Sequence, residues 1–311
     1  MSIAPYLREI GRGKEGARDL PRDKAFDLMS QLLDGQLSDI EKGGFALAMR
    51  IKGETPEELA GFMDAVVPRT LAFQAPSPAI VLPSYNGARK LPNLTPLLAL
   101  LLAREGVPVL VHGPLTDSAR TTSAEIFAAL GLPPVATAGE AQTRWASGQP
   151  AFMAVDVLHP PLAALLALRA VLGLRNSGHT LAKLLPAIPG ALRVVNHTHP
   201  EYATSLGAFL AQTQATAMLM RGTEGEPVAD ARRLPALRCF VHGIPDDTLS
   251  VEAQGGSLLE VPDLPPAIDA PATAAFIRSL LAGALPVPAP IIRQVNCLMA
   301  LRERASQQLR P

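Results

Sequence analysis

The alternation of short apolar runs with helical stretches after residue 78 constrains the fold of this chain more than any other feature. Six short apolar runs have the character of buried strands, at 79–82, 107–111, 151–157, 192–195, 216–220 and 238–241. Helical stretches lie between and after them, at 94–104, 123–130, 162–172, 202–212, 271–282 and 291–305. Strand–helix alternation of this kind predicts a mostly parallel sheet that is covered by helices on both faces.

The first 70 residues have a different pattern and are predicted to form a helical bundle. Ser38 and Glu41 fit a capping box, and so do Thr55 and Glu58, with Pro56 in the first turn of the second helix. Apolar residues recur at helical spacing before Gly35, which suits a helix end: Leu28, Met29, Leu32 and Leu33. We therefore expect a bundle over 1–72, a proline-containing linker near 71–78, and an α/β domain over 73–311.

Composition places the chain among globular proteins. With 311 residues, of which 48% are apolar, it can bury a large core. The longest apolar run spans only about ten residues and contains Pro96, so no membrane span and no membrane partner are expected. The N-terminus lacks a basic-then-apolar signal region, which predicts a cytoplasmic location. Cys239 and Cys297 lie far apart in the sequence, and each is predicted to be a reduced core residue.

Acidic and basic residues are unevenly distributed along the chain, although their numbers, 28 of each, are equal. The segment 157–200 contains no Asp or Glu, yet it holds the following basic residues and histidines: Arg169, Arg175, Lys183, Arg193, His159, His179, His197 and His199. Two interpretations remain open. The segment is either an apolar, half-buried region with few charges, or a positively polarised surface for phosphate groups.

Metal binding is not predicted. No Cys/His spacing matches a zinc site, and no third ligand accompanies the His-x-His pair at 197–199. Hydrogen-bonded loop histidines are the expected alternative. Glu224 and Glu226 have carboxylates of the kind that holds magnesium, but a turn rich in Gly and Glu needs no such explanation.

The whole pattern resembles the anthranilate phosphoribosyltransferase family, which also includes the related nucleoside-phosphorylase fold. The resemblance rests on four stretches in the family's order and spacing: 111–113, 123–131, 169–175 and 199–202. It implies a helical bundle that recruits part of 160–186, plus a larger α/β domain. It also implies a vestigial ligand site at Gly87, Asn93, His112 and Arg169.

The phosphate-binding loop departs from the family's pattern. The family's Gly-Thr-Gly-Gly-Asp loop corresponds here to 83–88, where only Gly87 remains, Pro83 donates no N–H, and the Tyr85 ring takes up space. The family's lysine and asparagine are absent from 111–115, and its Asp-Glu magnesium pair has no direct match. We therefore expect no phosphoribosyl transfer to anthranilate and no cofactor. The alternative is a transferase with an altered donor and acceptor, in which Arg169 holds an anionic acceptor and magnesium assists.

Three further stretches, 85–90, 172–183 and 221–227, resemble the YbiB-like branch of the family, which binds nucleic acid. This resemblance implies a homodimer whose helical domains meet, with basic grooves for DNA or RNA. Arg89, Lys90, Arg175 and Lys183 are the predicted contacts, although a solvated dipeptide and a helix cap or ion pair are the simpler interpretations. Aromatic residues make up only 4%, so binding through phosphates without reading sequence is expected. The apolar segment 44–49 also favours a dimer.

Overall fold

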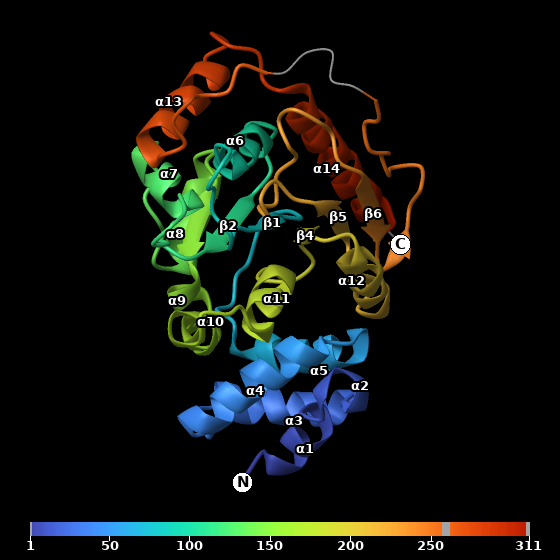
Figure 1. The fold of residues 1–311 in the computed structure, drawn as a ribbon. Coiled ribbons are helices and arrows are strands. Elements are labelled where there is room, and N and C mark those ends of the chain that lie inside the picture. Colours follow the sequence, from blue (N-terminus) through green and yellow to red (C-terminus); the bar gives the residue numbers. More distant parts are fainter. Residues whose placement is uncertain (1, 257–261, 309–311) are drawn as a thin grey trace. The chain divides into compact units, whose positions relative to one another are not determined.

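The computed structural model describes residues 2–256 and 262–308, which divide into two compact units (Figure 1). The first unit combines Met1–Leu71 with Val155–Ala187, and the second combines Ala72–Ala154 with Ile188–Pro311. The predicted combination of a helical bundle with an α/β domain is confirmed. Across the described ranges, no helix has both the length and the apolar character needed to cross a membrane.

Helices build the first unit. They are α1 (Ala4–Ile10), α2 (Gly13–Gly16), α3 (Arg22–Leu33), α4 (Asp39–Lys52), α5 (Pro56–Val66), α9 (Val155–Leu158), α10 (Pro160–Leu172) and α11 (Ser177–Leu184). Both predicted capping boxes are confirmed, at Ser38 before α4 and at Thr55 before α5. Gly35 follows the end of α3 with a φ of 72°, which only glycine adopts readily. Phe45 and Phe62 meet edge to face in the core, with their ring centroids 6.0 Å apart.

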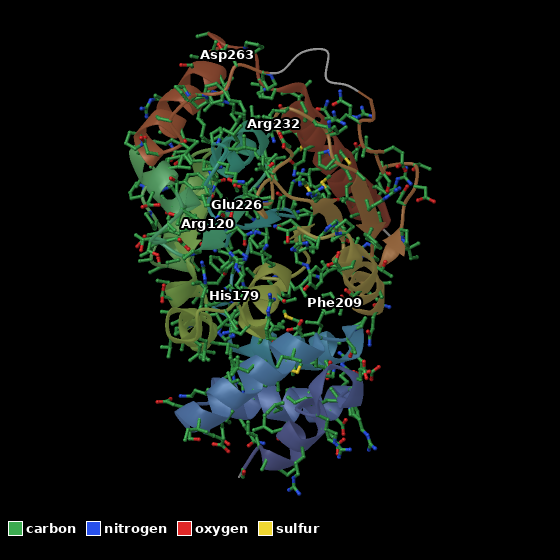
Figure 2. All side chains as sticks on the ribbon, in the orientation of Figure 1. Arg120, His179, Phe209, Glu226, Arg232 and Asp263 are labelled. Carbon is green, nitrogen blue, oxygen red and sulfur yellow. The ribbon has the colours of Figure 1, made fainter. Side chains whose placement is uncertain are left out.

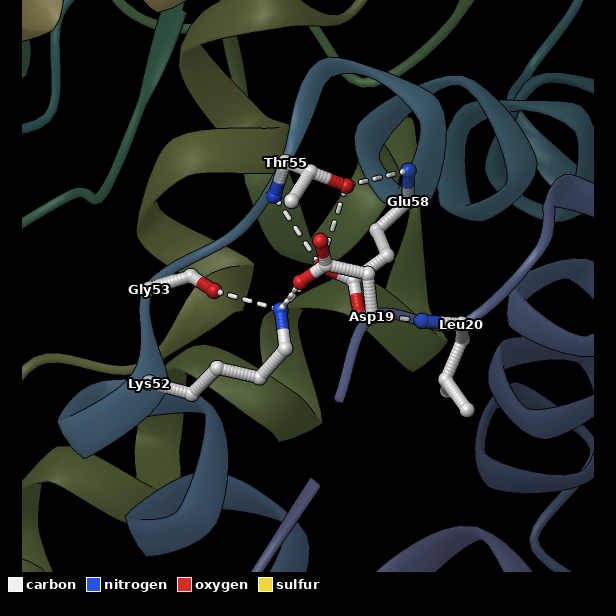
Figure 3. A network of polar contacts seen from close by, with 6 residues as sticks. All are labelled: Asp19, Leu20, Lys52, Gly53, Thr55 and Glu58. Carbon is white, nitrogen blue, oxygen red and sulfur yellow. Dashed lines mark hydrogen bonds and ion pairs between the residues drawn. The ribbon is translucent and has the colours of Figure 1, made fainter. Parts of the chain in front are cut away.

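A buried ionic network ties three segments of this unit together (Figure 3). The Glu58 carboxylate is fully buried and accepts the N–H of Leu20 at 2.9 Å and that of Thr55 at 2.9 Å. The Lys52 ammonium lies 2.7 Å from Glu58 and 2.7 Å from Asp19. Burial opposes the charge of Lys52, but its bonds to the two carboxylates outweigh burial and raise its pKa. The buried negative charge of Glu58 is therefore compensated by a cation.

The second unit contains a seven-stranded sheet with the order β3-β2-β1-β4-β5-β6-β7. Its strands are β1 (Ile80–Pro83), β2 (Val109–Gly113), β3 (Ala151–Ala154), β4 (Leu192–His197), β5 (Ala217–Arg221), β6 (Leu237–Val241) and β7 (Ile244–Pro245). Strands β1 to β5 pair in parallel, whereas β6 and β7 are antiparallel. The predicted strand over 151–157 is wrong beyond Ala154. Its partner β2 ends at Gly113, so the chain after Ala154 has no ladder to join and turns into α9.

Helices cover both faces of this sheet. They are α6 (Thr95–Arg104), α7 (Ser123–Ala129), α8 (Ala138–Ala146), α12 (Glu201–Gln212), α13 (Ala270–Leu281) and α14 (Ala289–Gln308). One apolar core joins alternate strand residues, such as Ile80 and Val109, to α6, α7, α13 and α14. On the opposite face, Gly207 of α12 approaches Leu219 and Phe240. The even burial of the strands explains why the sequence shows continuous apolar runs rather than alternation.

The two cysteines meet in the core of this unit. Cys239 on β6 and Cys297 on α14 are both buried and unbridged, with their sulfur atoms 3.4 Å apart. The predicted core position of each is confirmed. Their contact was not predictable from their separation of 58 residues in the chain.

Candidate functional site

Two loops of the second unit meet at the carboxyl ends of parallel strands. The chain runs from β1 outward to β2 and β3 on one side, and through β4 and β5 on the other. Loops that leave the sheet at such a reversal of strand order diverge, and this is where open α/β sheets bind ligands. Here the loop after β1 and the turn after β5 close onto each other instead.

Glycines allow this close approach. Gly87 has a φ of 67°, and a side chain there would place its Cβ 2.9 Å from the Cβ of Arg120. Gly225 has a φ of 86°, and its Cβ would lie 1.8 Å from the amide nitrogen of Asn86. That Asn86 amide donates to the carbonyl oxygen of Glu224 at 2.7 Å. The Asn86 side chain thus joins the turn after β5 at Gly225, and Gly87 allows the loop after β1 to approach the loop after β2 at Arg120.

The Glu226 carboxylate fills the loop after β1. Glu226, labelled in Figure 2, is buried, with 1% of its surface exposed. One of its carboxylate oxygens accepts the N–H groups of Asn86 at 2.7 Å and Gly87 at 2.8 Å. Its other oxygen accepts uncharged side-chain donors: the hydroxyls of Ser84 and Thr95, and more distantly, at 3.5 Å, the amide of Asn93. Thr95 opens α6, whose N-terminal end also favours negative charge. A buried carboxylate needs this many donors to offset its lost hydration.

The Glu224 carboxylate occupies the next part of the same loop. One oxygen accepts three N–H groups, from Arg89 at 2.8 Å, Lys90 at 3.0 Å and Leu91 at 3.3 Å. Burial opposes its charge, but the N–H groups and the positive charge of Arg120 outweigh burial and lower the pKa of Glu224 below its ordinary value. Glu224 itself has a φ of 52°, in the left-handed region that few non-glycine residues adopt.

The side chains of Arg89 and Lys90 are exposed while their backbone is held. Arg120, labelled in Figure 2, is half-buried and donates to the carbonyl oxygen of Gly87 in the same loop at 3.4 Å. The loop therefore directs its N–H groups inward to carboxylates and two cationic side chains outward to solvent.

His112 is part of the interior of this region. It lies at the end of β2 and is fully buried, and its Nδ1 is 2.7 Å from the Tyr85 hydroxyl. Burial lowers the pKa of His112 to about 3, so the ring is neutral. The Tyr85 ring packs edge to face against the imidazole, with centroids 5.4 Å apart. Of the residues predicted to form a vestigial ligand site, Gly87 and Asn93 thus donate hydrogen bonds to Glu226, while His112 is in contact with Tyr85.

The remaining predicted residues belong to the first unit. Arg169 on α10, Arg175 after it, and Lys183 on α11 are each half-buried. Their positive charges, after burial itself, lower the pKa of His179 to about 3 (Figure 2), so all three lie near this histidine. Arg193 does not join them, since it is buried on β4 of the second unit, where burial lowers its pKa to about 10. One of the four Lys and Arg residues of the acid-free segment is therefore not at the surface.

Magnesium does not fit the acidic turn after β5. The oxygens of Glu226 are surrounded by hydrogen-bond donors, which repel a cation, and Glu224 accepts three further N–H groups. Within the ranges that the structure describes, no group of three His, Cys, Asp or Glu side chains could hold a metal ion. The expected loop histidines are only partly found: His179 lies on α11, and the imidazole Nδ1 of His197 lies 3.1 Å from the carbonyl oxygen of His199.

The role of the two glutamates was not foreseen from the sequence. The sequence indicates either magnesium ligands or a plain turn at Glu224 and Glu226, and it does not reveal their contacts with residues more than 130 positions earlier in the chain. The sequence does contain two unusual features that together could indicate a contact between the loop and the turn. The loop over 83–88 has a single glycine, Gly87, and the turn at 224–226 has two glutamates on either side of one glycine.

Comparison with known proteins places the chain in a family. The helical bundle domain of a glycosyl transferase family matches residues 4–69. The chain is 42% identical to the uncharacterized protein YbiB of Escherichia coli over 312 residues, which covers 98% of this chain and 96% of that protein. It is 33% identical to the anthranilate phosphoribosyltransferase of Desulfitobacterium hafniense over 169 residues, which covers 54% of this chain and 50% of the enzyme.

Solved structures show the same fold. Anthranilate phosphoribosyltransferase from Thermus thermophilus superposes with a TM-score of 0.67 at 22% identity, covering 98% of this chain and 99% of that chain. The Saccharomyces cerevisiae enzyme in complex with PRPP and Mg gives a TM-score of 0.72 at 14% identity, covering 97% of this chain and 89% of that chain. Together with the relation to YbiB over almost the full length, these findings show that the chain belongs to the anthranilate phosphoribosyltransferase-like family.

Proposed function

We propose that this protein binds DNA or RNA through the phosphate backbone, without reading base sequence. One observation carries the proposal: Arg89 and Lys90 extend exposed cationic side chains from a loop whose backbone is anchored by Glu224. An anchored backbone reduces the conformational entropy that two long side chains lose when they bind phosphate. The loop's own N–H groups are already occupied, so its side chains are the available anion-binding groups.

A second positive cluster supports the same function. Arg169, Arg175 and Lys183 lie near His179 in the first unit, and no acidic residue occurs between 157 and 200. The Glu54 carboxylate bonds to Ser177 on α11, so three cationic residues stand against one acidic residue here, and such an excess of positive charge attracts polyanions and raises their rate of association. We assign Arg175 and Lys183 to nucleic-acid phosphates as well, each cluster acting within its own unit.

Fluorescence anisotropy with unrelated oligonucleotides at two salt concentrations tests the proposal. Wild-type affinity should fall steeply with salt and differ little between sequences. Reversing both charges, Arg89→Glu with Lys90→Glu, should weaken all sequences alike and lower the salt slope by about one unit per lost contact. The pair Arg175→Glu and Lys183→Glu should act in the same way.

The matched control reverses two exposed arginines of the second unit, Arg104→Glu with Arg278→Glu. Each donates to one backbone carbonyl, and together they change the net charge by the same amount. The control should bind nearly as tightly as wild type. No binding even at low salt would refute the function, whereas equal losses in the control and the Arg89/Lys90 variant would remove these residues from the site.

Homodimerisation belongs to the same proposal. Helix α4 exposes Ile40 (88%), Leu47 (42%) and Ile51 (58%), whose spacing places them along one helix face. An exposed apolar stripe of this kind is typical of an interface between protein chains. Sedimentation should give a dimer at micromolar concentration, and Ile51→Glu should shift it toward monomer. A wild-type monomer at that concentration would refute the dimer.

The alternative function is a transferase with an altered donor and acceptor. The fold favours it, and Arg169 would hold an anionic acceptor. The filling of the loop by Glu226 opposes it, because a pyrophosphate group needs the same N–H groups of Asn86 and Gly87. We therefore expect no turnover with anthranilate, phosphoribosyl pyrophosphate and magnesium. Measurable turnover, or thermal stabilisation by a sugar phosphate, would support the transferase instead.

A further inference from the structure

Three consecutive N–H groups converge on one oxygen of Glu224. The distances from the nitrogens of Arg89, Lys90 and Leu91 to this oxygen are 2.8, 3.0 and 3.3 Å. Successive backbone N–H groups that point to one place form a concavity for an anion, as they do around bound phosphates. In this structure the anion is a carboxylate of the same chain, which reaches the concavity from 133 to 135 residues away.

The turn that delivers this carboxylate does not itself need glutamate. Glu224 and Gly225 have φ values of 52° and 86°, and the N–H of Glu226 donates to the carbonyl oxygen of Thr223 at 2.9 Å. A turn with two positive φ values favours Asn-Gly or Gly-Gly at its centre. The backbone of the turn is therefore strained with glutamate at position 224, and Gly or Asn at this position would relieve the strain.

The surroundings of this carboxylate are cationic. The charge of Arg120 acts on it, and the side chains of Arg89 and Lys90 extend from two of the residues that donate to it. Unlike Glu226, which is buried, Glu224 is half-buried and can be reached from solvent. Without its carboxylate, the concavity would offer three N–H donors beside positive charge, which is the environment that phosphate oxygens prefer.

We propose that the backbone of residues 89–91 is a phosphate site which Glu224 fills from within, as a tethered competitor of external phosphate groups. The inference does not depend on nucleic-acid binding, because its first probe is inorganic phosphate. The phosphate oxygens could come from free phosphate or from a phosphodiester, and the experiment separates these two sources.

The test compares wild type with Glu224→Gly, in which the side chain is gone and the turn is relaxed. Thermal unfolding is measured in inorganic phosphate and in sodium chloride of equal ionic strength. Glu224→Gly should gain a saturable stabilisation of about 2–4 °C when phosphate reaches roughly ten times its Kd, and wild type should gain none. The control Glu105→Gln removes one negative charge from an exposed position in the same unit and should behave like wild type.

Two further measurements make the result decisive. The backbone amide signals of residues 89–91 in the Glu224→Gly protein should shift with phosphate in NMR spectra. A short oligonucleotide then identifies the source, since a shift of the same signals means that a phosphodiester also enters, and no shift means that free phosphate alone does. Glu224→Asn, whose side chain suits the turn but is too short to fill the concavity, should reproduce the glycine variant.

An equal response to phosphate in all four proteins, or no response in either position-224 variant, would overturn the proposal. Failure of both Glu224→Gly and Glu224→Asn to fold would overturn it as well, because the carboxylate would then be required by the turn. Oligonucleotide binding that fails in wild type while phosphate stabilises Glu224→Gly would refute the proposed function and leave this inference intact.

Discussion

Among the residues that the structure describes, each unit has one glutamate that is almost fully buried, and the two are compensated in different ways. Glu58 in the first unit and Glu226 in the second are 0% and 1% exposed, and both accept backbone N–H groups. Glu58 also binds the ammonium of Lys52, whereas the donors to Glu226 are all uncharged. The first carboxylate is half of an ion pair that holds helices together. The second joins the loop after β1 to the turn after β5 through neutral donors alone.

The two carboxylates also differ in how far their contacts reach along the chain. Glu58 belongs to a capping box, so its contact with Thr55 is local and visible in the sequence. Glu226 contacts Ser84, Asn86 and Gly87 across about 140 residues, and only the folded sheet brings them together. This comparison teaches that two equally buried carboxylates can be stabilised in different ways, one by a nearby cation within a local motif and the other by neutral donors brought together from distant parts of the chain.

Removing the Glu226 carboxylate should have the largest effect on stability. Glu226→Ala leaves two backbone N–H groups and two hydroxyls without their acceptor and opens a cavity, so we expect a loss of about 3–5 kcal/mol. Urea unfolding followed by the fluorescence of Trp145, the single tryptophan, reports on this unit directly.

Glu252→Ala is the matched control for that variant. Glu252 pairs with Arg238 on the surface, where its side chain is 78% exposed, so its removal should cost no more than about 1 kcal/mol. Equal losses in the two variants would mean that the Glu226 carboxylate contributes no more than a surface ion pair.

Breaking the ion pair in the first unit should have the second-largest effect. Lys52→Met leaves Glu58 buried without a cation, and we expect a loss of about 3 kcal/mol in chemical unfolding followed by helical circular dichroism. Adding Glu58→Gln removes the uncompensated charge, so the double variant should lose less than the sum of the single variants, by about 1–3 kcal/mol. Strict additivity would contradict the pairing of these charges.

The effect of acid on Glu224 should be the smallest. The pKa of Glu224 in the folded protein lies below the ordinary value of 4.5. The hydrogen bonds of its carboxylate therefore stabilise the folded protein fully above pH 4.5, and this stabilisation disappears as the pH falls through the lower pKa of the folded state. Wild type should exceed Glu224→Gln in unfolding free energy by about 1 kcal/mol near neutral pH. Unfolding measured as a function of pH should show this difference shrinking below pH 4.5. A difference that does not change with pH would show that the carboxylate's charge has no part in the contact.

Much of the fold was predictable because its signals are local. Capping boxes mark the starts of α4 and α5, and continuous apolar runs mark β1 and β2, since each strand is buried on both faces. Short helices without strong caps were missed, among them α2 and α9. The predicted strand after Ala154 failed because strand length is set by the partner strand, which local sequence does not reveal.

The site was predictable only in part. The position of Arg89 and Lys90 in the loop after β1 follows from the order of elements. The hydrogen bonds from the N–H groups of this loop to Glu224 and Glu226 cannot be predicted from that order, because they depend on which turn of the folded domain lies opposite the loop. Arg193 shows the same limit. Its charge counts toward a basic segment in the sequence, yet it lies on β4, whose residues Leu192–Asn196 are all buried.

The most direct test of this account is one NMR titration of the ¹⁵N-labelled protein with a short oligonucleotide at low salt. We predict that the side-chain Nε–H signal of Arg89 shifts in a saturable way while the backbone amide signals of Asn86 and Gly87 stay in place, because Glu226 keeps those amides occupied. Shifts of the Asn86 and Gly87 amides with an unchanged Arg89 side chain would contradict it. The phosphate would then be displacing Glu226, and the loop would be binding with its backbone rather than with its side chains.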